Sequence, residues 1–182
     1  METSPIKDIL YDTINQISES KIQSEISSGN KQKIITEILQ WCVPKITKLD
    51  GDRYENFGAF AESLLHYLLT NALIPSQRKI TIKNTEIDIV IPDSRTLDSA
   101  PKDSLVLYFA KTNNIHTIIE LLARLENIQP YKDNISIVAK AKLAIPYKTY
   151  DIDNASNFAT ILDDIDGFLA SRPQSKFRIF RT

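Results

Sequence analysis

The chain has 182 residues, of which 42% are hydrophobic and 25% charged, a balance that excludes wholesale disorder and a fibrous protein. No apolar run approaches the roughly 20 residues that span a bilayer, and no secretory signal pattern opens the chain, so we expect a cytoplasmic protein without membrane contact. Cys42 is the only cysteine, which excludes an internal disulfide and a cysteine-based zinc cluster.

The N-terminal part of the chain has a helical pattern. Ser4-Pro5 is typical of a helix start, and isoleucines then recur at helical spacing, less regularly towards residue 26. A second helix is predicted from residue 31 to about residue 43, where Pro44 bends or ends it. We interpret residues 1–50 as a helical extension. Its apolar stripe either packs on its own domain or docks to a protein partner or a second copy of the chain.

The centre of the chain changes from helical to strand periodicity. A broad apolar face predicts a buried helix over residues 57–69. Alternating residues over 79–83 and 86–91 predict two strands joined by a hairpin turn at Asn84-Thr85. The apolar run 105–110 predicts a central strand that is buried on both faces.

The rest of the chain supplies the elements that complete a sheet. A polar loop is predicted over residues 93–104. A helix, two strands, a final helix and a short basic strand or tail are then predicted at residues 115–128, 135–139, 144–150, 158–169 and 177–181. This order predicts an α/β fold over residues 51–182, with a mixed β-sheet flanked by helices.

Three charged residues stand at informative positions in this order. Glu62 lies on the buried helix GAFAESLLHYL, Asp88 lies in the strand EIDIVIPD, and Lys111 ends the strand LVLYFAKT. Over about residues 55–145 the chain therefore resembles the PD-(D/E)XK, or restriction-endonuclease-like, nucleases. The resemblance implies that fold, with Glu62, Asp88 and Lys111 as catalytic residues and with the two carboxylates binding Mg²⁺ or Mn²⁺.

The chemistry of phosphodiester hydrolysis explains why those residue types occur together. A bound Mg²⁺ polarises the phosphate and lowers the pKa of the attacking water, and it prefers carboxylate oxygens as ligands. A nearby lysine orients the water or stabilises developing negative charge. Each residue also fits an ordinary role. Asp88 fits the solvent face of a hairpin, Glu62 the polar edge of a helix, and Lys111 a solvated strand end.

The chain departs from the family pattern at Phe109, because the residue two before the lysine should be acidic or Gln. Residues two apart on a strand share a face, so a phenyl ring stands where a metal ligand is expected. Three alternatives follow. Glu120 on the next helix is a migrated catalytic and metal-binding carboxylate, Glu86 serves in its place, or the site is inactive.

Further candidates come from histidines and basic residues. His66 follows Glu62 by four residues and His116 opens the helix after Lys111, so each is either a metal ligand or an ordinary helix residue. The candidate nucleic-acid contacts are Arg78, Lys79, Lys83, Lys140, Lys142 and Lys148. Such lysines also protect the edges of sheets from unwanted pairing.

The resemblance favours a nuclease-fold protein of nucleic-acid metabolism, for example DNA repair. The missing carboxylate favours a catalytically inactive or atypical member that binds nucleic acid or protein. The alternative is an active Mg²⁺-dependent DNA or RNA endonuclease with a migrated carboxylate. The charge distribution is compatible with both functions. Residues 31–149 hold 16 basic and 13 acidic residues, which permits a nucleic-acid partner without requiring one.

Overall fold

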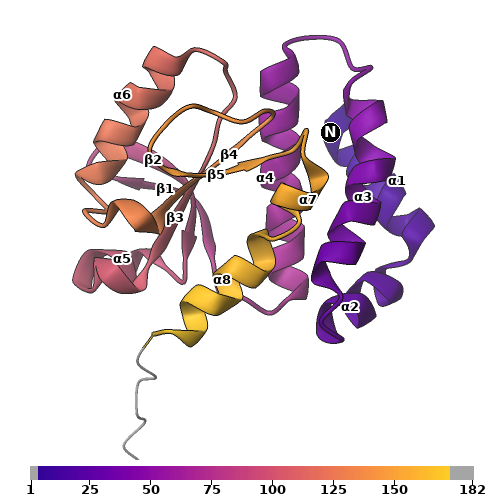
Figure 1. The fold of residues 1–182 in the computed structure, drawn as a ribbon, viewed down its shortest axis with the longest axis horizontal. Helices are drawn as coiled ribbons and strands as arrows, with labels where there is room; N and C mark the ends of the chain where they lie inside the picture. Colours follow the sequence, from indigo (N-terminus) through magenta and orange to yellow (C-terminus); the bar gives the residue numbers. More distant parts are fainter. Residues whose placement is uncertain (1–3, 173–182) are drawn as a thin grey trace, which may run out of the picture.

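The computed structural model describes residues 4–172, in which five strands form one mixed sheet with helices on both faces (Figure 1). The strand order is β1-β2-β3-β4-β5. The first three strands form an antiparallel meander, and β4 and β5 continue the sheet in parallel. The strands are β1 (Gln77–Ile82), β2 (Thr85–Ile91), β3 (Leu105–Phe109), β4 (Ile135–Ala139) and β5 (Lys148–Asp151). The predicted α/β class with a mixed, helix-flanked sheet is confirmed.

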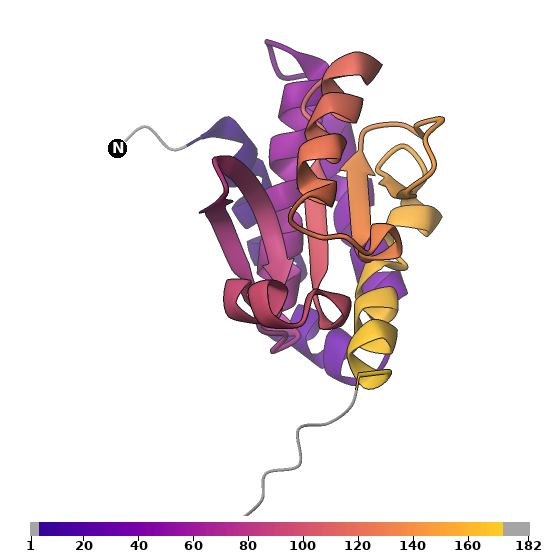
Figure 2. The same cartoon turned by 90° about the vertical axis from the view of Figure 1, so that its left-hand side faces the viewer.

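The helices form layers on the two faces of this sheet, as two views at right angles show (Figures 1 and 2). One face carries α5 and α6, and the other carries α4, which in turn lies against α1 to α3. The helices are α1 (Pro5–Ile17), α2 (Glu19–Ser27), α3 (Lys31–Ile46), α4 (Arg53–Asn71), α5 (Ser94–Ser99), α6 (Ile115–Glu126), α7 (Ala155–Phe158) and α8 (Ile161–Ala170). Among residues 4–172, none of these helices has the length and apolar character needed to cross a membrane.

Two hydrophobic cores follow from the alternation of side chains along the strands. Ile89 and Ile91 of β2 belong to the core beneath α4, whereas Val90 belongs to the core beneath α6. On α6, Ile118 and Leu122 repeat at helical spacing and are fully buried against the sheet. Because both faces of the sheet are covered, β3 and β4 are almost wholly apolar, as expected for central strands.

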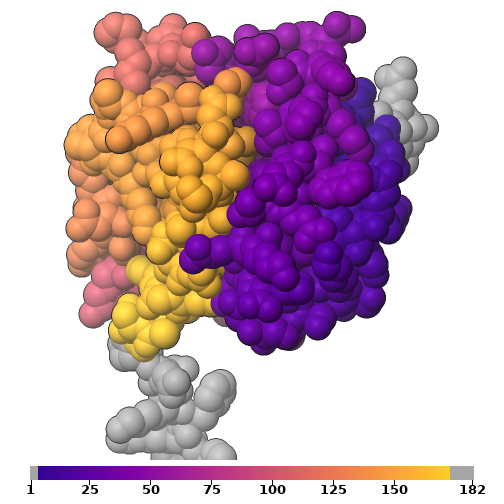
Figure 3. Space-filling model, turned by 45° about the vertical axis from the view of Figure 1, so that its right-hand side comes forward, coloured from indigo at the N-terminus to yellow at the C-terminus, as the bar shows by residue number. Residues whose placement is uncertain are grey.

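The N-terminal helices belong to the same core as α4. Leu10, Ile14 and Ile17 of α1 are buried, and α1 packs against α3 and α4. The space-filling view shows α3 lying against the C-terminal helices α7 and α8 (Figure 3), and Lys31 forms an ion pair with Asp163 of α8 over 3.8 Å. The apolar stripe therefore packs within the chain, so this face does not offer the docking surface weighed as the alternative.

Several predicted boundaries were wrong for identifiable reasons. Pro44 does not end α3, which continues one short turn to the buried Ile46. A break that was not predicted falls at Ser18, whose φ of 83° separates α1 from α2. The predicted loop 93–104 contains α5, whose N-terminus is capped by the Asp93 carboxylate through the Thr96 N–H at 2.7 Å.

Three smaller differences concern the ends of elements. The hairpin turn is Lys83-Asn84 instead of Asn84-Thr85, and both turn residues have positive φ, as a type I′ turn requires. The final helix is divided into α7 and α8 around Ala159 and Thr160. The strand or tail predicted at residues 177–181 lies outside the described residues.

Close contact between α4 and the end of β3 depends on Gly58. A Cβ atom at this position would lie 2.6 Å from Lys111 Cγ and 2.8 Å from the Ala110 carbonyl oxygen. The lysine side chain can move, but the carbonyl belongs to the backbone that follows a central strand. Gly58 therefore lets α4 approach the sheet closely enough to bring Glu62 to Lys111.

Replacement of Gly58 tests this packing. Gly58→Ala is expected to destabilise the protein by about 1–2 kcal/mol, because overpacking outweighs the roughly 1 kcal/mol gained in helix propensity. Gly167→Ala on α8 is the matched control, since nothing lies within 4 Å of its added Cβ, and it is expected to stabilise. Urea unfolding measures both. Equal stabilisation by the two variants would contradict the close contact.

Candidate functional site

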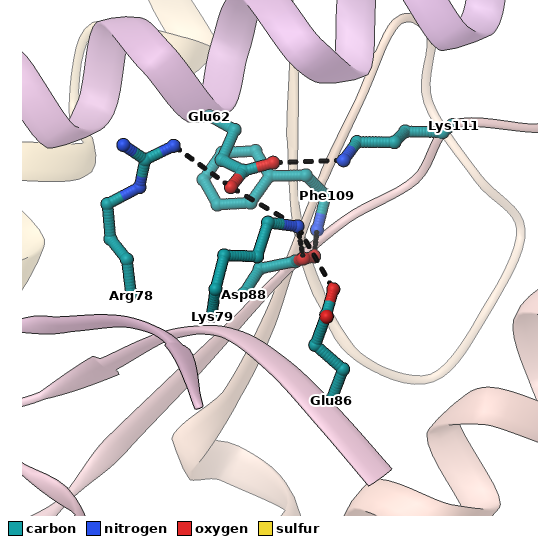
Figure 4. A network of polar contacts seen from close by, with 7 residues as sticks. All are labelled: Glu62, Arg78, Lys79, Glu86, Asp88, Phe109 and Lys111. Carbon is teal, nitrogen blue, oxygen red and sulfur yellow. Dashed lines mark hydrogen bonds and ion pairs between the residues drawn. The ribbon is translucent and has the colours of Figure 1, made fainter. Parts of the chain in front are cut away.

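Six charged side chains from four segments meet at one end of the sheet (Figure 4). They come from α4, from the paired strands β1 and β2, and from the segment after β3. We call them the ion-pair cluster: Glu62, Arg78, Lys79, Glu86, Asp88 and Lys111. The three residues that carried the family resemblance are therefore close together in space.

Glu62 is the most deeply buried member of the ion-pair cluster. Its side chain is only 4% exposed, yet it faces three cationic groups. Arg78 Nη2 donates to Glu62 Oε1 over 3.1 Å and Lys111 Nζ donates to Glu62 Oε2 over 3.0 Å, while Lys79 Nζ lies 3.3 Å from Oε1. A buried carboxylate is costly unless it is paired and hydrogen-bonded, and these partners meet that need.

Asp88 connects the ion-pair cluster to the backbone of the central strand. The ladder between β2 and β3 ends at the pair Ile89 and Leu107. Beyond that point the Phe109 N–H donates to Asp88 Oδ2 over 2.9 Å, and Lys79 Nζ donates to Oδ1 over 2.8 Å. The Asp88 side chain is 10% exposed, so it does not lie on the solvent face of the hairpin.

Lys79 reaches the ion-pair cluster because the alternation of side chains between the two faces of the sheet is interrupted at this point of β1 and β2. Arg78 contacts α4, whereas Ile80 packs with the core beneath α6, although residues two apart normally share a face. On the paired strand, Ile89 and Ile87 are divided between the two cores in the same way. Lys79 has a φ of 50°, a left-handed conformation that is unfavourable for a residue with a side chain.

The Lys79 ammonium occupies the centre of the ion-pair cluster. Its Nζ lies 2.8 Å from Asp88, 3.2 Å from Glu86 and 3.3 Å from Glu62. Burial alone would lower the pKa of Lys79, but the hydrogen bond and charge of Asp88, with the other two carboxylates, raise it. The group is therefore a permanent cation at physiological pH.

The same balance applies to Glu62. Burial alone would raise the pKa of its carboxyl, but the hydrogen bond and charge of Lys111, with the charge of Lys79 and the hydrogen bond of Arg78, outweigh burial and lower it. Glu62 is thus ionised at neutral pH. With three acidic and three basic members, the ion-pair cluster as a whole is electrically balanced.

Phe109 shows why the central strand supplies no carboxylate here. Its ring is buried in the core beneath α4, while its backbone N–H bonds to Asp88. An acidic side chain in that place would be buried, where an unpaired charge is costly.

The spacing of the three carboxylates bears on divalent metal binding. Oxygen ligands of Mg²⁺ lie at about 2.0–2.1 Å, whereas the carboxylate oxygens lie 2.8–3.3 Å from the Lys79 nitrogen. Over residues 4–172, no group of three or more His, Cys, Asp and Glu side chains is gathered tightly enough to hold a metal. At these distances the carboxylate oxygens fit an ammonium group. Mg²⁺ would fit only if the Lys79 side chain moved out and the three carboxylates moved closer together.

The other predicted metal-site candidates make no ion pair with the ion-pair cluster among residues 4–172, although His66 lies near Glu62 and Arg78. Glu120 is exposed on α6 and is not brought to the ion-pair cluster. The helix buries Ile118 and Leu122, each two positions from Glu120 and therefore on the opposite side of the helix. His66 and His116 are exposed on α4 and α6. Of the two replacements suggested for the missing carboxylate, only Glu86 reaches the site.

The predicted nucleic-acid contacts are only partly available. Lys140 pairs with Asp153 and Lys148 pairs with Asp164, over 2.8 and 2.9 Å. The other four are Arg78 and Lys79 in the ion-pair cluster, Lys83 at the hairpin turn, and the exposed Lys142.

A hollow of about 350 Å³ opens beside the ion-pair cluster. It is lined by Lys79, Asn84, Thr85, Glu86, Asp88, Tyr108, Phe109, Lys111, Leu121 and Arg124. Arg124 was not among the sequence candidates, because its spacing on α6 looks like that of any solvated helix residue. Only the packing of α6 over the hairpin turn places it here.

Comparisons with models of protein families, with curated proteins and with solved structures find no match for this chain.

Neutralising Glu62 tests the electrostatic description of the ion-pair cluster. Glu62→Gln is expected to cost about 1–3 kcal/mol at pH 7. This is less than for a fully enclosed pair, because the three cations are about a third exposed. Since the folded-state pKa of Glu62 is lowered, its stabilisation is present above the unfolded pKa of about 4.3 and is lost as pH falls through the folded value.

The measurement is urea unfolding of both proteins between pH 7 and pH 3. The difference between wild type and Glu62→Gln should shrink in the acid range. Glu120→Gln removes the same charge from an exposed position and should change stability by less than about 0.5 kcal/mol. A pH-independent cost for Glu62→Gln would count against the lowered pKa.

Proposed function

We propose that this chain is a nuclease-fold protein of nucleic-acid metabolism that binds nucleic acid and does not hydrolyse it on its own. The restriction-endonuclease-like assignment is supported by the order of α4, the β1–β2–β3 meander and the crossover helix α6. It is also supported by the meeting of Glu62, Asp88 and Lys111 at one end of the sheet.

The position of Lys79 carries the proposal. Metal-dependent phosphodiester hydrolysis needs a cation that polarises the phosphate and lowers the pKa of a water molecule. The Lys79 ammonium holds the three carboxylates at ammonium distances, and its raised pKa keeps its proton in place. The Lys79 ammonium balances the charge of the carboxylates, but unlike a metal ion it has no coordination position at which a ligand could bind. Phe109 removes the remaining carboxylate that the family pattern would supply.

A second function is favoured by one observation. The carboxylates of Glu62, Glu86 and Asp88 converge on the Lys79 ammonium, and the Glu86 side chain is 61% exposed. In a conformation with Lys79 withdrawn, they would offer the hard oxygen ligands that bind Mg²⁺ or Mn²⁺, which would activate a water for hydrolysis. Lys111 would remain to orient that water.

Removal of the Lys79 charge distinguishes the two functions. In Lys79→Met the carboxylates lose their shared cation, so the affinity for Mn²⁺ measured by calorimetry is expected to rise at least about tenfold over wild type. Lys142→Met removes the same charge from an exposed position and should leave the affinity unchanged. Equal Mn²⁺ affinity in Lys79→Met and wild type would contradict the role given to Lys79.

Hydrolysis is measured in parallel with single-stranded, duplex and branched DNA and with Mg²⁺ or Mn²⁺. The wild type is expected to bind DNA without cleaving it. Metal-dependent cleavage by the wild type that disappears in both Asp88→Ala and Lys111→Ala would establish the second function instead. Cleavage that survives Asp88→Ala would contradict the site assigned to it.

A further inference from the structure

A second hollow extends the first one away from the ion-pair cluster. It has a volume of about 420 Å³ and is lined by Lys83, Asn84, Thr85, Arg124, Asn127 and Ile128. Asn84, Thr85 and Arg124 line both hollows, so the two lie next to each other. We call them the inner hollow, beside the ion-pair cluster, and the outer hollow. Their lining residues come largely from the β1–β2 turn and α6, two elements on the side of the molecule turned forward in Figure 2, and we call the two hollows together the groove.

The positive charge of this groove is concentrated in the outer hollow. The acids of the inner hollow, Glu86 and Asp88, both pair with Lys79. The outer hollow is lined by two basic residues, Lys83 and Arg124, and by no acidic residue. Arg124 is exposed and forms no ion pair with any residue between 4 and 172. An anionic ligand therefore gains most from the outer hollow.

The outer hollow is built from fixed elements. Lys83 and Asn84 form the turn with positive φ, and Lys83 Nζ donates to the Asn127 carbonyl oxygen at the end of α6 over 3.3 Å. The side-chain amides of Asn84 and Asn127 add hydrogen-bond donors to the two cations. This combination of guanidinium, ammonium and amide groups is the set that proteins use to contact phosphate oxygens.

The inner hollow offers a different kind of contact. Tyr108, on the central strand β3, is half-buried and lines the hollow. An aromatic ring beside a cationic groove suits a base stacked next to its phosphate. A base in a duplex is already stacked between its neighbours and is not free to enter such a hollow.

We propose that this groove binds a single nucleic-acid strand, with a phosphate held by Arg124 and Lys83 and a neighbouring base stacked on Tyr108. The proposal rests on the proposed function and adds to it the form of the ligand and the residues that bind it. The balanced ion-pair cluster closes the inner end of the groove and offers the strand no excess positive charge.

Equilibrium binding of a fluorescent 20-nucleotide single strand tests the phosphate contact. Arg124→Ala is expected to weaken binding about five- to tenfold at low salt and to reduce the slope of log K against log salt by about 0.7. Lys83→Ala should act in the same direction, and Arg124→Lys should restore most of the affinity. Lys7→Ala on α1 removes the same charge from an exposed position away from the groove and should bind like the wild type.

The stacking contact has its own variants. Tyr108→Phe keeps an aromatic ring and should bind within about twofold of wild type, whereas Tyr108→Leu should lose at least about fivefold. Thermal unfolding of each variant identifies any loss that reflects misfolding. Arg124→Ala and Arg124→Lys lie on an exposed helix surface and keep the test valid if Tyr108→Leu does not fold.

The outcomes separate this proposal from the function on which it rests. If the wild type binds neither single-stranded nor duplex DNA or RNA, the proposed function fails. If it binds but Arg124→Ala, Lys83→Ala and Lys7→Ala all match it, only the groove is wrong. Tighter binding of a duplex of the same length than of the single strand would overturn the choice of a single strand.

Discussion

The buried carboxylate of Glu62 is the charge around which one end of the sheet is organised. It lies on α4 within an apolar core, where an unpaired ion would be strongly destabilising. Arg78 and Lys79 approach it from β1, and Lys111 approaches it from the segment after β3. Satisfying this one carboxylate thus links α4 to the first strand and to the end of the central strand.

This constraint explains features that are unfavourable when considered alone. The left-handed backbone at Lys79 costs local conformational energy, yet it directs the ammonium between the carboxylates. The end of the β2–β3 ladder leaves the Phe109 N–H without a strand partner, and Asp88 accepts it. Each local irregularity is compensated by a charged contact, so the ion-pair cluster is part of the fold as well as a candidate site.

The sequence predicted the elements well where apolar periodicity is strong. The helix around Glu62, the strand around Asp88 and the strand before Lys111 were all found, because their periods differ clearly. Lys79 was classed with the basic edge residues, since no pattern signals that a lysine will adopt positive φ and change the face of its strand. Arg124 was missed for a related reason: its importance depends on how α6 lies over a turn far away in the sequence.

The same limits explain the errors outside the site. The spacing of Ile118 and Leu122 already placed Glu120 on the opposite side of α6, but it could not show that Glu86 reaches the site, because that depends on the face change at Lys79. Helices were predicted where the structure has α1, α2 and α3, but periodicity cannot say whether an apolar stripe packs on its own chain. In the structure, Leu10 and Ile14 contribute to the core that also contains α4.

The core that α4 shares with α1 to α3 affects the order in which parts of the protein unfold locally. Nine of the nineteen residues of α4 are buried, because the helix lies between the sheet on one side and α1 to α3 on the other. Backbone amides in such a central helix exchange with solvent only when the surrounding layers separate. We therefore expect the segment that carries Glu62 to belong to the slowest-exchanging unit of the protein, with α1 to α3 covering it on one side.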